Sequence, residues 1–138
     1  MDSGTGQRAK VLLIDDDELL REVFCSMLSR RHSVVGVATG TEAIEQLTGS
    51  SHEFDVVVCD IQLPDLDGRA IYRRMQQVAP EYVDRMIFCT GGSVDPQMLD
   101  FLDDVGEERV LNKPCTVDEL LDAVSAAHRR GSGRGAVC

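Results

Sequence analysis

The chain has 138 residues and a formal net charge of −10, from 14 Lys+Arg and 24 Asp+Glu. That length suits one domain with a core of its own. The acidic balance argues against a protein that coats nucleic acid or an anionic membrane surface, because both carry negative charge. No apolar stretch is long enough to cross a bilayer, and the first residues show no secretory pattern.

The five cysteines and three histidines are widely spaced, and no two cysteines form a C-x-x-C pair. An odd number of cysteines without framework spacing predicts a reducing compartment, and hence a cytoplasmic protein. The scattered histidines make a zinc site unexpected. A metal bound by this chain should therefore be a hard cation with oxygen ligands.

Short apolar runs alternate along the chain with segments whose apolar residues recur at helical spacing. Strands are predicted at residues 11–14, 34–38, 56–59, 86–89 and 109–112. The helices between and after them are predicted to bury Leu19, Leu20, Val23, Phe24, Met27, Leu28, Ala43, Ile44, Leu47, Ile71, Met75, Val78, Met98, Leu99, Phe101, Leu102, Val117, Leu120, Leu121, Val124 and Ala127.

This (βα)5 alternation predicts an α/β domain, a doubly wound parallel sheet with helices on both faces. We expect the domain to span residues 10–130. Residues 1–9 and the glycine-rich residues 131–138 are expected to be flexible ends.

Four of the five predicted strands end at a polar residue or pair, namely Asp15 with Asp16, Asp60, Thr90 and Lys113. Parallel strands place their carboxyl ends at one edge of the sheet, where open α/β sheets bind ligands. Three carboxylates brought together repel one another, and Mg²⁺, which prefers oxygen ligands, relieves that repulsion. An aspartate beside Mg²⁺ and a lysine can attack phosphorus and form an acyl phosphate.

Four motifs in this order resemble the receiver domain of two-component response regulators. They are VLLIDD at 11–16, VVCDIQLPDLDG at 57–68, FCT at 88–90 and KP at 113–114. The resemblance covers roughly residues 10–130, nearly the whole chain. It implies a flavodoxin-like sheet with strand order 2-1-3-4-5.

The resemblance also assigns roles to individual residues. It implies that Asp60 is the phosphoacceptor and that Lys113 pairs with the phosphoryl group. It makes Asp15 and Asp16 the acidic pair that holds Mg²⁺ together with Asp60. Two further implied roles are a backbone carbonyl ligand at Gln62 and a switch hydroxyl at Thr90.

Three positions depart from the family pattern. Val110 stands three residues before the lysine, where the family often has an aromatic residue that turns inward on phosphorylation. Gly91 and Gly92 follow Thr90, where many members have larger side chains. Gly91 should leave room for phosphoryl entry, and Gly92 offers no side chain to shield the site from water, which we expect to affect the lifetime of the phosphorylated state.

The neighbouring acids have simpler interpretations. Asp17 and Glu18 suit a helix N-terminus, where negative charge interacts favourably with the helix dipole. Asp65 and Asp67 are expected to be turn and N-cap residues rather than metal ligands.

The resemblance implies a phosphohistidine-bearing partner, either a sensor histidine kinase or a phosphotransfer protein, and a downstream protein target. It implies no direct contact with nucleic acid and no membrane contact in this segment. The chain is either a stand-alone regulator or the receiver of a larger protein such as a hybrid sensor histidine kinase. The Gly91–Gly92 pair and Val110 favour the second origin. Whether such a domain is called an enzyme is partly a matter of definition, because it catalyses its own phosphorylation and dephosphorylation.

Two other functions stay open. A haloacid-dehalogenase-type phosphohydrolase would use Asp15, since Asp15–Asp17 contain an Asp-x-Asp motif after a strand. That class expects Thr or Val two residues after the motif, where this chain has Leu19. A receiver-like module used only for constitutive docking is the other alternative. The aspartate that takes the phosphoryl group, Asp15 or Asp60, separates the hydrolase from the receiver.

Overall fold

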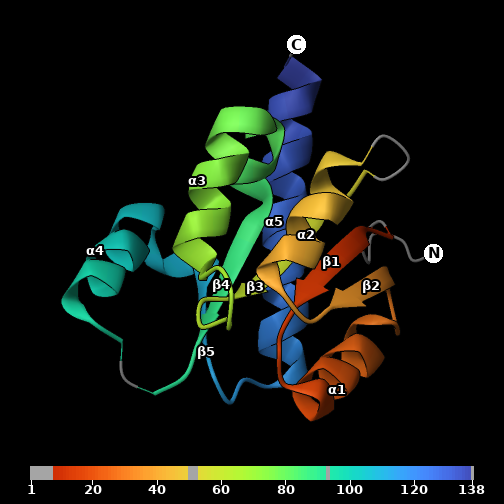
Figure 1. Ribbon diagram of the computed structural model, residues 1–138. Helices are drawn as coiled ribbons and strands as arrows, with labels where there is room; N and C mark the ends of the chain where they lie inside the picture. Colours follow the sequence, from red (N-terminus) through yellow and green to blue (C-terminus); the bar gives the residue numbers. More distant parts are fainter. Residues whose placement is uncertain (1–7, 50–52, 93, 138) are drawn as a thin grey trace.

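The computed structural model describes residues 8–49, 53–92 and 94–137 (Figure 1). Its strands are β1 (Lys10–Ile14), β2 (Ser33–Val37), β3 (Val56–Asp60), β4 (Met86–Thr90) and β5 (Val110–Asn112). Its α-helices are α1 (Glu18–Leu28), α2 (Gly40–Thr48), α3 (Gly68–Val78), α4 (Pro96–Val105) and α5 (Val117–Val137). Within the described residues, two short 3₁₀ helices, η2 (Pro80–Arg85) and η3 (Glu107–Arg109), precede β4 and β5.

The five strands form one sheet in the order β2-β1-β3-β4-β5, and all of its strand pairs are parallel. This confirms the predicted fold class and strand order. The strand order reverses direction between β1 and β3, and such a switch point creates a crevice at the carboxyl ends of the strands. The ends of β1 and β3 therefore lie side by side, with β4 next to β3.

Alternate residues of the central strands feed two separate cores, one on each face of the sheet. Leu12 and Ile14 of β1 pack with residues of α2, α3 and α4. Val11 and Leu13 pack on the other face with residues of α1 and α5. Burial on both faces explains why β1, β3 and β4 are continuous apolar runs rather than alternating patterns.

Several apolar helix residues that were predicted to face inward are exposed instead. Leu19 is 69% exposed and Val23 is 39% exposed in α1, while Val78 and Leu99 are each 51% exposed. The predicted apolar face of α1 is wider than the strip that reaches the sheet, and only Phe24 and Leu28 of that helix are buried. Helical spacing therefore identified the side of each helix that faces the sheet, but it overestimated how many residues on that side are buried.

Side-chain caps fix the beginning of each α-helix. The Asp67 carboxylate accepts a hydrogen bond from Ala70 N at 2.9 Å, which begins α3. Asp95 caps α4 in the same way, and proline follows it at the first helical position. A capping box begins α5, where Thr116 N donates to Glu119 Oε1 at 2.8 Å and Glu119 N donates to Thr116 Oγ1 at 3.0 Å.

The last helix is longer than the sequence predicted. Helix α5 was expected to end near Arg130, before a glycine-rich tail, whereas it continues to Val137 (Figure 1). Gly131 is buried, and a Cβ atom there would lie 2.9 Å from Arg85 Nε. The glycine that was expected to begin a tail instead lets α5 pass close to the Arg85 side chain.

The expected flexible N-terminal segment lies mostly outside the described residues, which begin at Arg8. Ala9 is buried, and its N–H donates to Nδ1 of the buried His32 at 3.1 Å. The described structure therefore begins just before β1. Among the described residues, no helix combines the length and the apolar composition that a bilayer crossing requires.

Candidate functional site

The end of β1 carries two aspartates with different surroundings. Asp15 is only 1% exposed, and its Oδ1 accepts a hydrogen bond from Asp17 N at 2.9 Å. Arg21 Nη1 holds the same residue from α1 by donating to the Asp15 carbonyl oxygen at 2.8 Å. Asp16, the next residue, is exposed. The first aspartate is therefore held in a buried position, while the second is exposed to solvent.

Asp60 is the last residue of β3 and lies beside this pair. Its Oδ1 accepts a hydrogen bond from Gln62 N at 2.9 Å, which orients the carboxyl group within its own loop. The residue is 9% exposed, so the carboxyl group is mostly shielded but still reachable from solvent. Gln62 is thus joined to Asp60 through its backbone N–H, while the role of its carbonyl oxygen as a metal ligand stays a prediction.

Lys113 reaches the two buried carboxylates from the end of β5. Its Nζ lies 2.9 Å from Asp60 Oδ2 and 3.1 Å from Asp15 Oδ2. Its backbone N–H donates to the Thr90 carbonyl oxygen at 2.8 Å, and its peptide bond to Pro114 is cis. A Cβ atom on Gly91 would lie 3.2 Å from Lys113 Cβ, so glycine allows this close approach.

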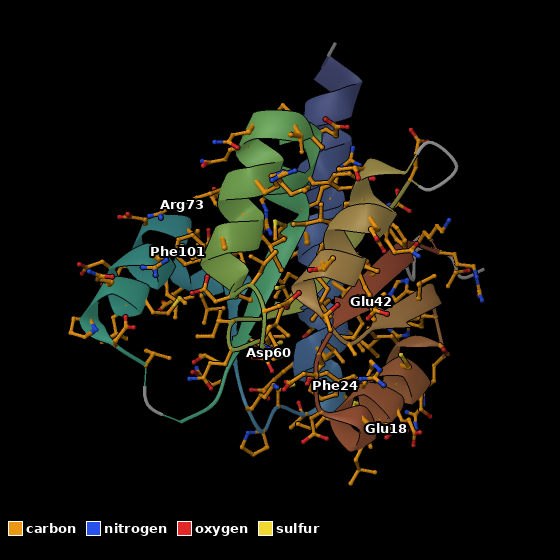
Figure 2. All side chains as sticks on the ribbon, viewed as in Figure 1. Glu18, Phe24, Glu42, Asp60, Arg73 and Phe101 are labelled. Atoms are coloured by element: carbon orange, nitrogen blue, oxygen red, sulfur yellow. The ribbon has the colours of Figure 1, made fainter. Side chains whose placement is uncertain are left out.

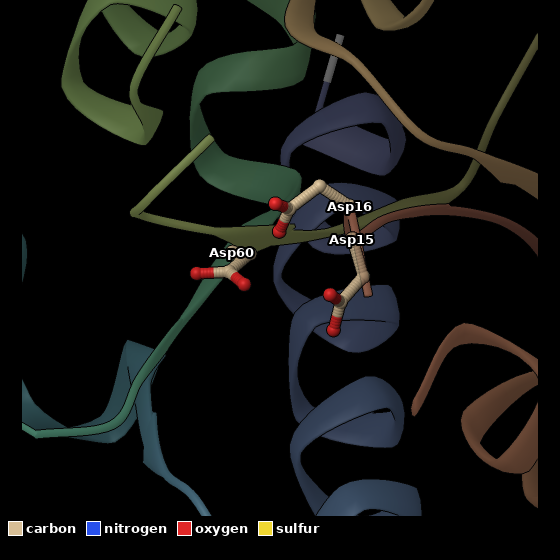
Figure 3. Close-up of side chains that lie close together, drawn as sticks. All are labelled: Asp15, Asp16 and Asp60. Carbon is tan, nitrogen blue, oxygen red and sulfur yellow. The ribbon is translucent and has the colours of Figure 1, made fainter. Parts of the chain in front are cut away.

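Asp15, Asp16 and Asp60 form one acidic cluster (Figure 3). Each offers one carboxylate oxygen, and these three oxygens lie within 4.8 Å of one another. All three candidate metal ligands are carboxylate oxygens, and one of them belongs to the exposed Asp16. This set suits a cation that prefers oxygen ligands and keeps part of its water shell. Mg²⁺ has these preferences, so the residues present fit the predicted metal.

Burial disfavours the charged forms of Asp60 and Lys113, whereas their hydrogen bonds favour the charged forms. Burial raises the pKa of Asp60 above its ordinary value, and the Gln62 N–H and the Lys113 ammonium offset this only in part. Burial also opposes the charge on Lys113, but its hydrogen bonds to Asp60 and Asp15 outweigh burial and raise its pKa to about 12. Lys113 is therefore a permanent cation at neutral pH, between two carboxylates.

The sequence also matches a known protein family. The family model of the response regulator receiver domain matches residues 11–125. The chain belongs to this family. Receiver domains are modules of two-component signalling, and the predicted resemblance is confirmed at the level of the family.

Curated relatives of this receiver include both regulators and sensor kinases. The transcriptional regulatory protein PmrA of Pectobacterium parmentieri is 32% identical over 124 residues, which cover 90% of this chain and 54% of that protein. The autoinducer 2 sensor kinase/phosphatase LuxQ of Vibrio vulnificus is 33% identical over 124 residues, covering 85% of this chain and 13% of that protein. Protein RcaC of Microchaete diplosiphon is 32% identical, covering 89% of this chain and 18% of that protein. The chain thus spans about half or less of the length of these three relatives.

Solved structures give the same fold. The receiver domain of an HD domain-containing protein from Pseudomonas fluorescens superposes with a TM-score of 0.80 at 26% identity, covering 99% of this chain and 98% of that one. A CheY-like receiver domain protein from Methanospirillum hungatei also superposes with a TM-score of 0.80, at 21% identity, covering 94% of this chain and all of that one.

The receiver's predicted switch positions lie on neighbouring strands. Thr90 ends β4 and is 9% exposed, directly beside the β3 end that carries Asp60. Val110 begins β5, pairs in register with Phe88 and is half-buried against the same core. Gly92 has a positive φ of 81°, and nothing lies within 4 Å of where its Cβ would be. The role of each in switching stays a prediction.

One residue of the loop after β3 has a role that the sequence did not indicate. Asp65 was expected to be a turn residue of its own loop, yet its carboxylate also accepts hydrogen bonds from the backbone of the first residues of α2, about 25 positions earlier in the chain. No local pattern shows such a contact, because it depends on the place where two separate loops meet.

Proposed function

We propose that this receiver domain accepts a phosphoryl group on Asp60 from a phosphohistidine of a sensor histidine kinase or phosphotransfer protein. The observation that carries the proposal is the position of Lys113 Nζ, 2.9 Å from Asp60 Oδ2 and 3.1 Å from Asp15 Oδ2. One cation joined to both carboxylates can move with little rearrangement to an oxygen of an incoming phosphoryl group. Such preorganised charge stabilises a transferring group.

The chemistry is a displacement at phosphorus. A carboxylate oxygen of Asp60 forms a bond to phosphorus while the phosphorus–nitrogen bond of phosphohistidine breaks. The departing imidazole leaves neutral after it has taken up a proton, and the product is an acyl phosphate on Asp60. Hydrolysis later transfers the phosphoryl group to water and restores the carboxylate.

Asp15, Asp16 and Asp60 would hold Mg²⁺, with the backbone carbonyl of Gln62 as a further ligand. The bound cation would neutralise charge on the phosphoryl oxygens as they approach three carboxylates. Asp16 is suited to the outer position because it is exposed, whereas Asp15 is held inside by Asp17 N and Lys113.

Accessibility favours Asp60 over Asp15 as the nucleophile. The Asp15 side chain is 2% exposed and that of Asp60 is 11% exposed. An incoming phosphorus atom can therefore reach Asp60 more easily. This difference, together with the family match, supports the receiver and disfavours a haloacid-dehalogenase-type reaction at Asp15.

The output of the domain is a shift between two conformations, which the added dianionic group biases. Thr90 is the candidate hydroxyl that contacts the phosphoryl group, and a downstream protein would bind the altered surface. The four cysteines of the described residues are free thiols, which supports a reducing cytoplasmic setting. Relatives with sensor-kinase names support an origin in a hybrid kinase as well as in a separate regulator.

Incubation with acetyl phosphate and Mg²⁺ tests the proposal directly. Intact-mass spectrometry should show one added phosphoryl group on the parent and none on the Asp60→Asn variant. The Asp17→Asn variant is a matched control, because Asp17 lies beside the cluster and Asn can also cap helix α1. Equal labelling of the parent and the Asp60→Asn variant would refute the proposal.

A further inference from the structure

Asp65 ties the loop that follows the predicted phosphoacceptor to the start of helix α2. Its Oδ1 accepts a hydrogen bond from Gly40 N at 2.8 Å. Its Oδ2 accepts two more, from Thr41 N at 2.9 Å and from Thr41 Oγ1 at 2.6 Å. These bonds hold the pKa of the Asp65 carboxyl group well below its usual range, and the hydrogen bond from the Thr41 hydroxyl has the largest effect. The carboxylate thus joins two loops at the carboxyl edge of the sheet.

Gly40 allows the two loops to touch. A Cβ atom on Gly40 would lie 2.7 Å from Leu66 Cβ and 3.1 Å from the Leu66 carbonyl oxygen. A contact below 3.0 Å requires one of the two atoms to shift, and Leu66 Cβ can shift only if the loop backbone that carries it moves as well. Any larger residue at position 40 would push Leu66 and Asp65 away from α2.

The β3–α3 loop, residues 61–67, is also fixed at its other end. Ile61 N donates to the Cys89 carbonyl oxygen at 3.1 Å, and Gly68 N donates to the Ile61 carbonyl oxygen at 3.1 Å. Gln62 therefore lies between an anchor on the sheet, through Ile61, and an anchor on helix α2, through Asp65. Only Leu63 and Pro64 separate it from Asp65, and the proline ring restricts that short connection.

We infer that Asp65 is a positioning residue for the metal site: by binding the N-terminus of α2 it holds the β3–α3 loop so that the Gln62 backbone can serve as a ligand of Mg²⁺. The inference rests on the proposed function. Asp65 itself faces α2 with both carboxylate oxygens occupied, so it is not a ligand. Groups that orient metal ligands in this way commonly change metal affinity by about 10- to 100-fold when they are removed.

A purely structural role for Asp65 makes a different prediction, and the chain offers a control for it. Glu42 also stabilises the start of α2, because its Oε1 accepts from Ala38 N at 3.0 Å and from Thr39 Oγ1 at 3.3 Å. Figure 2 shows Glu42 on the first turn of that helix. Loss of either cap should destabilise the domain by a similar amount, which urea unfolding measures. These two Glu42 hydrogen bonds, however, stay within residues 38–42 and do not reach the β3–α3 loop.

The test is a Mg²⁺ titration without any phosphodonor, followed through the backbone amide signals of the labelled protein by NMR. The variants are Asp65→Ala, Gly40→Ala and Glu42→Ala, and urea unfolding shows what fraction of each is folded. We expect Asp65→Ala and Gly40→Ala to raise the dissociation constant for Mg²⁺ about tenfold, with Glu42→Ala close to the parent. Gly40→Ala removes no charge, so its effect cannot come from a lost carboxylate.

Two results would overturn the inference. One is equal weakening of Mg²⁺ binding by Glu42→Ala and Asp65→Ala, which would mean that α2 stability alone matters. The other is an unchanged dissociation constant in Gly40→Ala. Failure of the proposed metal site is distinguishable from both, because the parent itself would then show no saturable response to Mg²⁺.

Discussion

Lys113 Nζ lies 2.9 Å from Asp60 Oδ2 although 53 residues separate the two in the chain. The contact depends on the sheet order, which brings the ends of β3 and β5 to the same edge with β4 between them. Asp60 is partly buried, and an unpaired carboxylate in that position would be costly. The lysine therefore stabilises the resting domain with the same ammonium that is available to a phosphoryl group.

Replacement of Lys113 should impair phosphorylation. We expect Lys113→Met to lower the rate of labelling by acetyl phosphate about a hundredfold, since one preorganised donor to developing charge is lost. Lys113→Arg should fall in between, because it keeps the charge but has a planar, forked donor group. The initial rate at saturating Mg²⁺ measures this effect. A rate for Lys113→Met within twofold of the parent would contradict it.

Phe101, which is labelled on α4 in Figure 2, should contribute to stability through an aromatic cluster with Tyr72 of α3 and Phe88 of β4. Its ring centroid lies 5.3 Å from that of Tyr72 and 5.2 Å from that of Phe88, both in edge-to-face geometry. We expect Phe101→Ala to reduce the free energy of unfolding by about 2–3 kcal/mol, since truncation of a packed phenylalanine costs several kcal/mol when it is fully buried. Urea denaturation measures the change.

Leu99 provides the control for that measurement. It lies on the same helix but is 51% exposed, so Leu99→Ala should change the free energy of unfolding by less than about 0.5 kcal/mol. Equal effects of the two substitutions would show that the aromatic cluster does not hold α4 in place.

Gly92 is predicted to shorten the lifetime of the phosphorylated state because it exposes the acyl phosphate to water. Its φ of 81° rules out most side chains without strain, but asparagine tolerates this region. We expect Gly92→Asn to slow phosphate loss by up to about fivefold, which corresponds to about 1 kcal/mol in the barrier. The decay of label after removal of acetyl phosphate gives the rate. Unchanged or faster decay would exclude this role for Gly92.

His32 should make stability depend on pH near neutrality. Burial lowers the pKa of its imidazole below 6.5, and the nearby charges of His128, Arg31 and Arg8 lower it further. The unfolded chain then binds the proton more readily than the folded one, so stability is fully present above about pH 6.5 and falls as the pH drops below that value.

NMR titration of the His32 ring signals measures this pKa, and urea unfolding at pH 7.5 and pH 5.5 measures the consequence. His32→Gln should lose less stability than the parent between these two pH values, because glutamine does not titrate. A His32 pKa at or above 6.5 would contradict this expectation.

Local sequence patterns predicted the ends of the strands well. Asp15, Asp60, Thr90 and Lys113 each interrupt a short apolar run, and the parallel sheet brings those interruptions together regardless of the loops between them. The strand order came from the family resemblance, because alternation of strands and helices is compatible with more than one order. The structure confirms it.

Features that depend on contacts between distant segments were not predictable in this way. Leu19 has a helical spacing that suits a buried face, but no other element covers it, and it is 69% exposed. Gly131 looks like a helix breaker in the sequence, whereas its small size allows α5 to pass Arg85. Asp65 caps helix α2, which lies about 25 positions earlier in the chain. In each case the neighbour that decides the outcome lies far away in the chain.

The measurement that tests the central claim most directly is the identification of the phosphorylated side chain. Borohydride reduction converts an aspartyl phosphate into homoserine, and peptide mass spectrometry then locates that residue after labelling with acetyl phosphate and Mg²⁺. Our account predicts homoserine at position 60 and aspartate at positions 15 and 16. Homoserine at position 15, or at none of the three positions, would contradict it.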